Sequence, residues 1–135
     1  MNKRATKYIS FFIADTYYAI PMAFVGSFIK YDNLLPVPKA SELVKGLTYQ
    51  NGKIITVIDS AKILGLVNRN NFDICLSFFI NDETFALPVT EGGEMIKSSQ
   101  LFTDRKKNKF KKYIKINKNK FYILFPEDIL KEMSL

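Results

Sequence analysis

The sequence predicts an all-β protein made of two similar small barrels, and two observations lead to this prediction. An internal repeat divides the 135 residues into two halves of about 67 residues. Within each half, short apolar segments alternate with turn-forming residues at the spacing typical of small barrels. The hydrophobic fraction of 47% and the charged fraction of 24% are those of a globular protein, which excludes a disordered or fibrous chain.

The repeat is clearest when residues 10–30 are placed over residues 77–97 without a gap. Ten of the 21 aligned positions are identical, and they include the pairs Ser10/Ser77 and Gly26/Gly93. We therefore expect both segments to form the same arrangement of strands. Because a 67-residue half is marginal as an independent domain, the halves, about 1–67 and 68–135, should share a buried interface within one domain spanning 1–135.

The first half is expected to begin with the strand Tyr8–Ala14, followed by a turn at Asp15-Thr16 and a returning strand. The pair Asn51-Gly52 separates two apolar runs and predicts a hairpin, since both residues readily adopt the left-handed turn conformation. Two prolines keep residues 34–38 extended. Other expected elements are a third apolar segment at Val25–Tyr31, the hairpin strands Lys45–Gln50 and Lys53–Ile58, and helical turns over Asp59–Leu64 with Asp59 as N-cap.

The second half is expected to repeat these elements and to end in a short helix. The offset of 67 places Lys118-Asn119 over the turn Asn51-Gly52. The helix Glu127–Met133 begins with acidic residues, which are favourable at a helix N-terminus. The expected strands are Phe72–Ile80, Thr84–Val89, Glu94–Ile96, Lys111–Ile116 and Phe121–Phe125.

The composition argues against an enzyme. The chain has no histidine and only one cysteine, Cys75, which excludes an internal disulfide, a Cys/His zinc site and a histidine base. Asp15 and Asp82 occupy equivalent positions, where turn formation accounts for both. We expect Cys75 to be a buried apolar residue in a strand. The sequence thus predicts no catalytic residue, no metal and no cofactor.

The charge is concentrated in one segment. Of the net charge of +7, residues 97–120 contribute ten basic and one acidic side chain, or +9, and the remaining residues contribute −2. Lysines mixed with Phe110 and Tyr113 could bind single-stranded nucleic acid, with the rings stacking on bases. The competing interpretation makes the two rings the buried side of a lysine-coated segment, with Lys106, Lys107, Lys109, Lys111 and Lys112 solvated. We prefer this second interpretation and keep a basic nucleic-acid-binding barrel as the alternative.

The N-terminal region indicates a cytoplasmic protein. Seven residues, five of them basic or polar, precede the apolar run Tyr8–Ala14, and this start faintly resembles a signal peptide. The run is short and ends at Asp15, so a buried strand explains it better. No apolar run reaches the roughly 18 residues of a membrane helix, so we expect no direct membrane insertion.

Several segments resemble the CheW family of bacterial chemotaxis coupling proteins. The resemblance rests on their order and spacing rather than on any single residue. It covers nearly the whole chain, including the later segment Phe85–Ile96 and the closing hairpin Tyr113–Phe125. In the first half it runs through Tyr8–Ile13, Tyr18–Pro21, Leu35–Pro38, Val44–Asp59 and Leu64–Leu66.

The resemblance implies a fold and a function. The fold would be two intertwined five-stranded barrels of SH3-like type. The function would be that of a non-enzymatic adaptor that binds the regulatory domain of a CheA-type histidine kinase and the cytoplasmic tip of a chemoreceptor. The chain departs from the family pattern in its charges, because Ser27 replaces an acid and Asn51 an arginine. It could thus be a divergent paralogue, or a structural domain that no longer binds CheA.

The resemblance also implies partner-binding residues around the groove between the barrels. Replacement of the charged pair by Ser27 and Asn51 would leave apolar contact as the main attraction. Phe28 and Tyr49 are added as neighbours that could instead belong to the core. The positions carried over by the family pattern are Val25, Ser27, Asn51, Val89 and Thr90.

Overall fold

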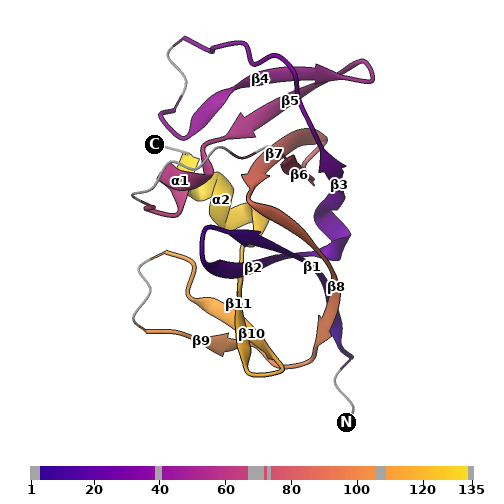
Figure 1. The fold of residues 1–135 in the computed structure, drawn as a ribbon, viewed down its shortest axis with the longest axis vertical. Helices are drawn as coiled ribbons and strands as arrows, with labels where there is room; N and C mark the ends of the chain where they lie inside the picture. Colours follow the sequence, from indigo (N-terminus) through magenta and orange to yellow (C-terminus); the bar gives the residue numbers. More distant parts are fainter. Residues whose placement is uncertain (1–3, 39–40, 67–71, 73, 106–108, 134–135) are drawn as a thin grey trace.

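The computed structural model describes residues 4–38, 41–66, 72, 74–105 and 109–133, and its regular structure is mostly β-strand (Figure 1). The first half contains β1 (Thr6–Ile13), β2 (Thr16–Pro21), the 3-10 turn η1 (Met22–Phe24), β3 (Val25–Ile29), β4 (Val44–Gln50), β5 (Lys53–Ile58) and α1 (Ser60–Ile63). The second half contains β6 (Ile74–Ile80), β7 (Glu83–Val89), β8 (Glu91–Ser98), β9 (Phe102–Thr103), β10 (Lys112–Ile116), β11 (Asn119–Ile123) and α2 (Pro126–Met133).

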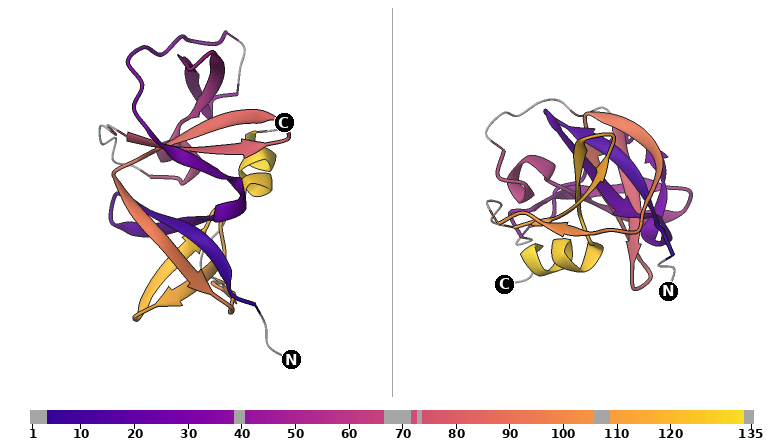
Figure 2. Two further views of the ribbon diagram at one scale, coloured as in Figure 1. Left: turned by 90° about the vertical axis from the view of Figure 1, so that its right-hand side faces the viewer. Right: turned by 90° about the horizontal axis from the view of Figure 1, so that it is seen from below.

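The strands form two sheets, and each sheet takes strands from both halves of the chain. The six-stranded sheet, in the order β8-β1-β2-β11-β10-β9, is here called barrel A. The five-stranded sheet, in the order β3-β6-β7-β5-β4, is called barrel B. Two views at right angles to Figure 1 show both sheets strongly curled, with α2 beside them (Figure 2). The all-β class and the paired barrels expected from the sequence are confirmed. The halves exchange strands, as the family resemblance implied.

The pairing pattern follows the repeat. The hairpin β1–β2 pairs Phe11 with Tyr18, and the hairpin β6–β7 pairs Phe78 with Phe85, 67 residues later in each case. In each barrel, a strand from the other half pairs in parallel with the second strand of this hairpin: β11 with β2, and β5 with β7. The segments 10–30 and 77–97 therefore have the same strand topology, as predicted.

The hydrophobic core has three parts, and the largest lies between the barrels. Phe11 and Tyr18 stack with ring centroids 5.9 Å apart, and their repeat partners Phe78 and Phe85 stack at 5.6 Å. This central core also includes residues of α1 and α2, and it buries the face that the two barrels share. Smaller clusters fill each barrel: Tyr8, Ala19, Ile114, Phe121 and Ile123 in barrel A, and Ile55, Val57, Cys75 and Ala86 in barrel B.

The conserved spacing of serine and glycine in the repeat has a structural cause. The Ser10 hydroxyl donates to the carbonyl oxygen of Glu94 and accepts from its N–H, both at 3.0 Å. Ser77 makes the equivalent bonds to Ser27, at 3.1 and 2.9 Å. Each serine thus holds an irregular step in the neighbouring strand, where the pairing register shifts. A glycine beside each step, Gly93 or Gly26, leaves room for the hydroxyl: a Cβ there would lie 2.2 or 2.4 Å from the serine oxygen.

Two turns differ by one residue from the sequence prediction. The hairpin β4–β5 turns at Asn51-Gly52 as expected, with φ of 52° and 76°. Its counterpart turns at Asn117-Lys118, with φ of 50° and 71°, rather than at Lys118-Asn119. The repeat offset therefore falls from 67 to 66 before the second hairpin. The first hairpin turns at residues 14–15, and Thr16 already belongs to β2.

The helices close the two halves at equivalent places. The Asp59 carboxylate accepts from the Lys62 N–H at 3.1 Å, which confirms Asp59 as the N-cap of α1. Helix α2 begins at Pro126, one residue before the expected start, and carries Glu127 and Asp128 in its first turn. Residues 34–38 form no strand: Leu35 pairs with Leu47 in one bridge through two hydrogen bonds of 2.8 Å, and Pro38 lies in a turn.

Candidate protein-binding site

The strands β3 and β8 lie against each other on one side of the molecule, which faces the viewer in the left view of Figure 2. The ring of Phe28 on β3 packs over Gly92 on β8, where a Cβ would lie only 3.1 Å from the ring. Val25 and Phe28 are half-buried and pack against the central core. We call the residues Val25, Ser27, Phe28 and Thr90 the crossing surface.

Two polar residues of the crossing surface are fixed by backbone contacts and keep exposed side chains. The backbone of Ser27 is held by Ser77, as described above, while the Ser27 side chain is exposed. The Thr90 N–H donates to the Phe12 carbonyl at 2.8 Å, and its hydroxyl accepts from the Ala14 N–H at 2.9 Å. Neither side chain is ionisable, so attraction here depends on apolar contact and neutral hydrogen bonds.

Tyr49 and Asn51 lie apart from the crossing surface, on the β4–β5 hairpin. Tyr49 is 67% exposed and therefore belongs to the surface rather than to the core. Asn51 is a turn residue with φ of 52°, and this left-handed conformation forms the hairpin turn. The Gln50 amide donates to the Lys30 carbonyl and ties this hairpin to the far end of β3, away from Val25. With the exception of Val89, the predicted residues therefore divide into two separate surface regions.

Val89 is not a surface residue. Its side chain is fully buried in the central core, with 0% exposure. The alternating pattern of β7 places Phe85, Leu87 and Val89 on the face between the barrels. A substitution at Val89 would therefore test folding rather than binding, and we leave this residue out of the crossing surface.

The lysine-rich segment lies on barrel A and is exposed where it is described. Phe110 is buried, as the preferred interpretation required, whereas Tyr113 is only half-buried; Lys109, Lys111 and Lys112 are exposed. Lys106 and Lys107 lie outside the described residues. On the outer face of β10 and β11, the Lys115 ammonium lies 5.3 Å from the centre of the Phe102 ring and Lys120 lies 4.8 Å from that of Tyr113.

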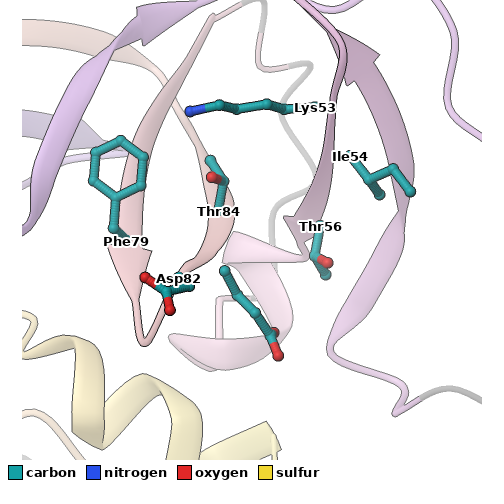
Figure 3. A pocket seen from close by; sticks show the side chains of 7 residues that line it. Lys53, Ile54, Thr56, Phe79, Asp82 and Thr84 are labelled. Atoms are coloured by element: carbon teal, nitrogen blue, oxygen red, sulfur yellow. The ribbon is translucent and has the colours of Figure 1, made fainter.

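A hollow at the open end of barrel B was not predicted from the sequence. It has a volume of about 620 Å³ and opens between the β4–β5 and β6–β7 hairpins. The side chains of Lys53, Phe79 and Thr84 approach one another there, with Lys53 extending toward the Phe79 ring (Figure 3). Two of its lining residues are apolar and exposed, Ile54 at 56% and Phe79 at 39%, but the sequence alone does not bring them together.

The described residues offer little to catalysis. Cys75 is buried as expected, and burial raises the pKa of its thiol to about 12, although Lys45 partly opposes this shift. Asp15 and Asp82 lie in or at turns. Within the described ranges, no group of three or more His, Cys, Asp or Glu side chains could hold a metal ion. Among the helices of those ranges, none is both long and apolar enough to span a membrane.

Comparisons with known proteins agree with the resemblance read from the sequence. Residues 7–73 match the family model of the CheW-like domain. The fold matches the crystal structure of the scaffolding protein TtCheW from Thermoanaerobacter tengcongensis with a TM-score of 0.77. That match has 21% identity and covers 89% of this chain and 88% of the other. The search of curated proteins finds no match. The suspected CheW resemblance is therefore confirmed.

Proposed function

We propose that this chain, which carries a CheW-like domain match over residues 7–73, is a chemotaxis adaptor that joins chemoreceptors to a CheA-type histidine kinase. The supporting observation is the two-barrel fold with its exchanged strands, which the chain shares with a CheW scaffolding protein at a TM-score of 0.77. An adaptor acts by presenting surfaces, and it needs no reactive group. The absence of histidine from the sequence fits this role.

The crossing surface is the proposed contact with the receptor tip. Val25 and Phe28 offer apolar area that is half-buried and held in place by the central core. A few such anchors supply most of the energy of a protein interface, while neutral neighbours such as Ser27 exclude water. Because no charged pair lies at Ser27 and Asn51, the association should depend weakly on salt.

The direct test measures binding to a CheA regulatory domain and to a receptor cytoplasmic fragment in separate pull-downs, followed by titration of any captured partner. Val25→Asp should weaken binding to at least one partner by about 1 kcal/mol or more, since it places a charge in a desolvated contact. Leu101→Asp is the matched control, because it adds the same charge at a 47% exposed apolar residue outside the crossing surface.

Thermal melting separates loss of binding from loss of folding. Val25→Asp should stay folded but melt below the wild-type temperature, because Val25 is half-buried against the central core, whereas Val89→Asp should unfold the protein because it buries an unpaired charge. Failure of the wild-type chain to bind either partner would refute the adaptor function. A folded Val25→Asp protein that binds both partners normally would exclude Val25 from the interface.

Nucleic-acid binding is the alternative that the lysine-rich segment keeps open, and one titration decides it. A single-stranded oligonucleotide is added at physiological salt and at lower salt. Under the adaptor proposal, we expect no saturable binding at physiological salt. Binding whose logarithm falls steeply with the logarithm of salt concentration would indicate neutralised phosphates and favour the alternative.

A further inference from the structure

The open end of barrel A contains a second hollow, with a volume of about 350 Å³. Three of its lining residues are aromatic, Phe12, Tyr17 and Phe121, and they come from the neighbouring strands β1, β2 and β11. The Tyr17 ring centroid lies 4.6 Å from that of Phe12 and 4.8 Å from that of Phe121. Because Tyr17 is 39% exposed, solvent reaches this ring cluster. The faces of such rings attract cations as well as apolar groups.

Two glutamates bring negative charge to the same hollow. Glu91 on β8 pairs directly with Phe12 on β1, and residues directly opposite each other in a sheet lie on the same face. Glu94 also lines the hollow, and its backbone is held by the Ser10 hydroxyl. Both glutamates are exposed, and neither carboxylate forms an ion pair with a described residue. The described lining therefore has a formal charge of −2, in a chain whose net charge is +7.

Barrel B differs at the equivalent place because it supplies a cation of its own. Lys53 is the first residue after the β4–β5 turn, and it extends toward the Phe79 ring (Figure 3). Asn119 has the same position after the β10–β11 turn of barrel A, and no lysine of the described ranges lines that hollow. The next residue, Lys120, lies on the outer face, with its ammonium 4.8 Å from the centre of the Tyr113 ring. The rings and carboxylates of barrel A thus lack the ammonium that barrel B provides.

We infer that the hollow of barrel A binds a small organic cation, an alkylammonium ion that takes the place of the lysine in barrel B. Its methyl or methylene groups pack on Phe12, Tyr17 and Phe121, and its nitrogen lies near Glu91 and Glu94. Ring faces and carboxylates both attract positive charge, and the apolar ring surface favours a cation that carries carbon over a hydrated metal ion. This inference goes beyond the adaptor function and does not rest on it.

The test titrates the full chain, labelled with nitrogen-15, with choline and with 1,4-diaminobutane at constant ionic strength. Each cation has a neutral analogue of similar shape, which is 3,3-dimethyl-1-butanol for choline and 1,4-butanediol for the diamine. We expect saturable chemical-shift changes at the amides of Phe12, Tyr17 and Glu91 with at least one of the two cations. Its neutral analogue should bind about tenfold more weakly or worse, because it lacks the charge that the rings and carboxylates attract.

Variants assign the binding to the hollow. Asn119→Lys supplies an ammonium at the position used in barrel B, and it should weaken cation binding about tenfold. Glu91→Gln and Glu94→Gln should each weaken binding about threefold, since each removes one carboxylate and keeps the shape of the side chain. Glu42→Gln removes an exposed carboxylate outside the hollow and should leave binding unchanged. Circular dichroism melts verify the folding of each variant, and the two glutamine variants of the hollow serve if Asn119→Lys does not fold.

Several results would overturn the inference. Absence of saturable shifts with both cations would do so, as would equal affinity for a cation and its neutral analogue. Unchanged affinity in folded Asn119→Lys or Glu91→Gln would place the cation elsewhere on the protein. Concentration-dependent shifts of Phe12 and Tyr17 without added cation, accompanied by dimers in sedimentation, would assign the hollow to a side chain of a second copy of the chain instead.

Discussion

Barrel A and barrel B share one pattern of strand pairing but differ at their open ends and in their charge. Barrel A has three packed rings, Phe12, Tyr17 and Phe121, beside a hollow of about 350 Å³ at its end, whereas barrel B has a hollow of about 620 Å³ beside Phe79. Barrel A also carries the exposed lysines of β10 and β11. The backbone plan thus tolerates large changes at the barrel ends, while the central core keeps matched ring pairs from both halves.

Gly26 and Gly93, the glycines beside the two register shifts, give the largest expected difference in stability between the halves. A Cβ at Gly93 would lie 2.5 Å from the Ser10 carbonyl oxygen, which is backbone and cannot rotate away. At Gly26 the closest atoms belong to the side chains of Ser77 and Phe79. In urea unfolding at pH 7, Gly93→Ala should cost about 3 kcal/mol or more and Gly26→Ala about 1–2 kcal/mol.

A second substitution sharpens this comparison. Ser77→Ala should partly rescue Gly26→Ala, because it removes the oxygen that lies 2.4 Å from the new Cβ. Ser10→Ala should rescue Gly93→Ala much less, since the backbone clash remains. The expectation is contradicted if both glycine variants lose the same stability and both are rescued to the same extent. The contact with the Ser10 carbonyl oxygen would then be unimportant.

Ser10 and Ser77, the serines that hold the two register shifts, should contribute about equally to the free energy of unfolding. Ser10 and Ser77 are both buried, and each hydroxyl bonds both backbone groups of one residue in the neighbouring strand. Ser10→Ala or Ser77→Ala should each lower the free energy of unfolding by about 1–2 kcal/mol, because partly buried groups lose their partner. The corresponding change to threonine retains the hydroxyl and serves as a control. A cost near zero for either alanine variant would show that water replaces the hydroxyl there.

The hairpin turns offer a smaller contrast. Gly52 and Lys118 occupy the same turn position with φ of 76° and 71°, a conformation that is easy for glycine and unfavourable for lysine. Lys118→Gly should raise the free energy of unfolding by about 1 kcal/mol, and Gly52→Lys should lower it by a similar amount. Both are measured by urea unfolding. A destabilised Lys118→Gly protein would contradict the assigned turn.

The free energy of unfolding should fall gradually as the pH rises above 9 and should not depend on these groups at neutral pH. Burial raises the pKa of Cys75 from 9.0 to about 12 in the fold. The thiol therefore stabilises the fold fully below pH 9, and this contribution is lost as the pH rises from 9 toward 12. Tyr122 in barrel A has a similarly raised pKa of about 12, from burial and its bond to Asp104.

Unfolding experiments between pH 8 and 11 check this dependence. Stability should fall with pH in the wild-type protein and less steeply in Cys75→Ala, which removes one of the three groups whose pKa is raised, the others being Tyr18 and Tyr122. A thiol reagent at pH 8 should react with Cys75 only at the rate of unfolding. Rapid reaction of the folded protein would show that the thiol is accessible.

The repeat made the fold predictable, but it did not determine how strands are shared between the halves. Identical residues such as Ser10 and Ser77 show that two segments have the same structure, without showing which copy each strand pairs with. The residues alone therefore allowed a separate barrel for each half, and the strand exchange was implied only by the resemblance to CheW. The helix cap at Asp59 and the Asn51-Gly52 turn could be predicted because their causes are local.

The candidate site was less predictable than the fold because burial depends on distant parts of the chain. Val89 reads as one more apolar residue at the end of a strand, and only the packing of barrel against barrel buries it. Tyr49 and Phe28 were equally ambiguous, yet one is 67% exposed and the other is half-buried. The hollow beside Phe79 depends on Thr84, which has the position in barrel B that Tyr17 has in barrel A. Recognising this equivalence requires knowledge of the exact strand register.

The strand exchange has a consequence for the order in which the chain can fold during its synthesis. In barrel A, Ala19 lies beside Ile123, so a strand made early must wait for one made about a hundred residues later. Long separations of this kind slow folding, because the intervening loop must close first. Barrel B has all its strands once β7 has left the ribosome, yet its central-core face lacks partners from β11 and α2 until later. The nascent chain therefore exposes an apolar face until its last helix emerges, and this interval is when the protein is most open to aggregation or to a chaperone.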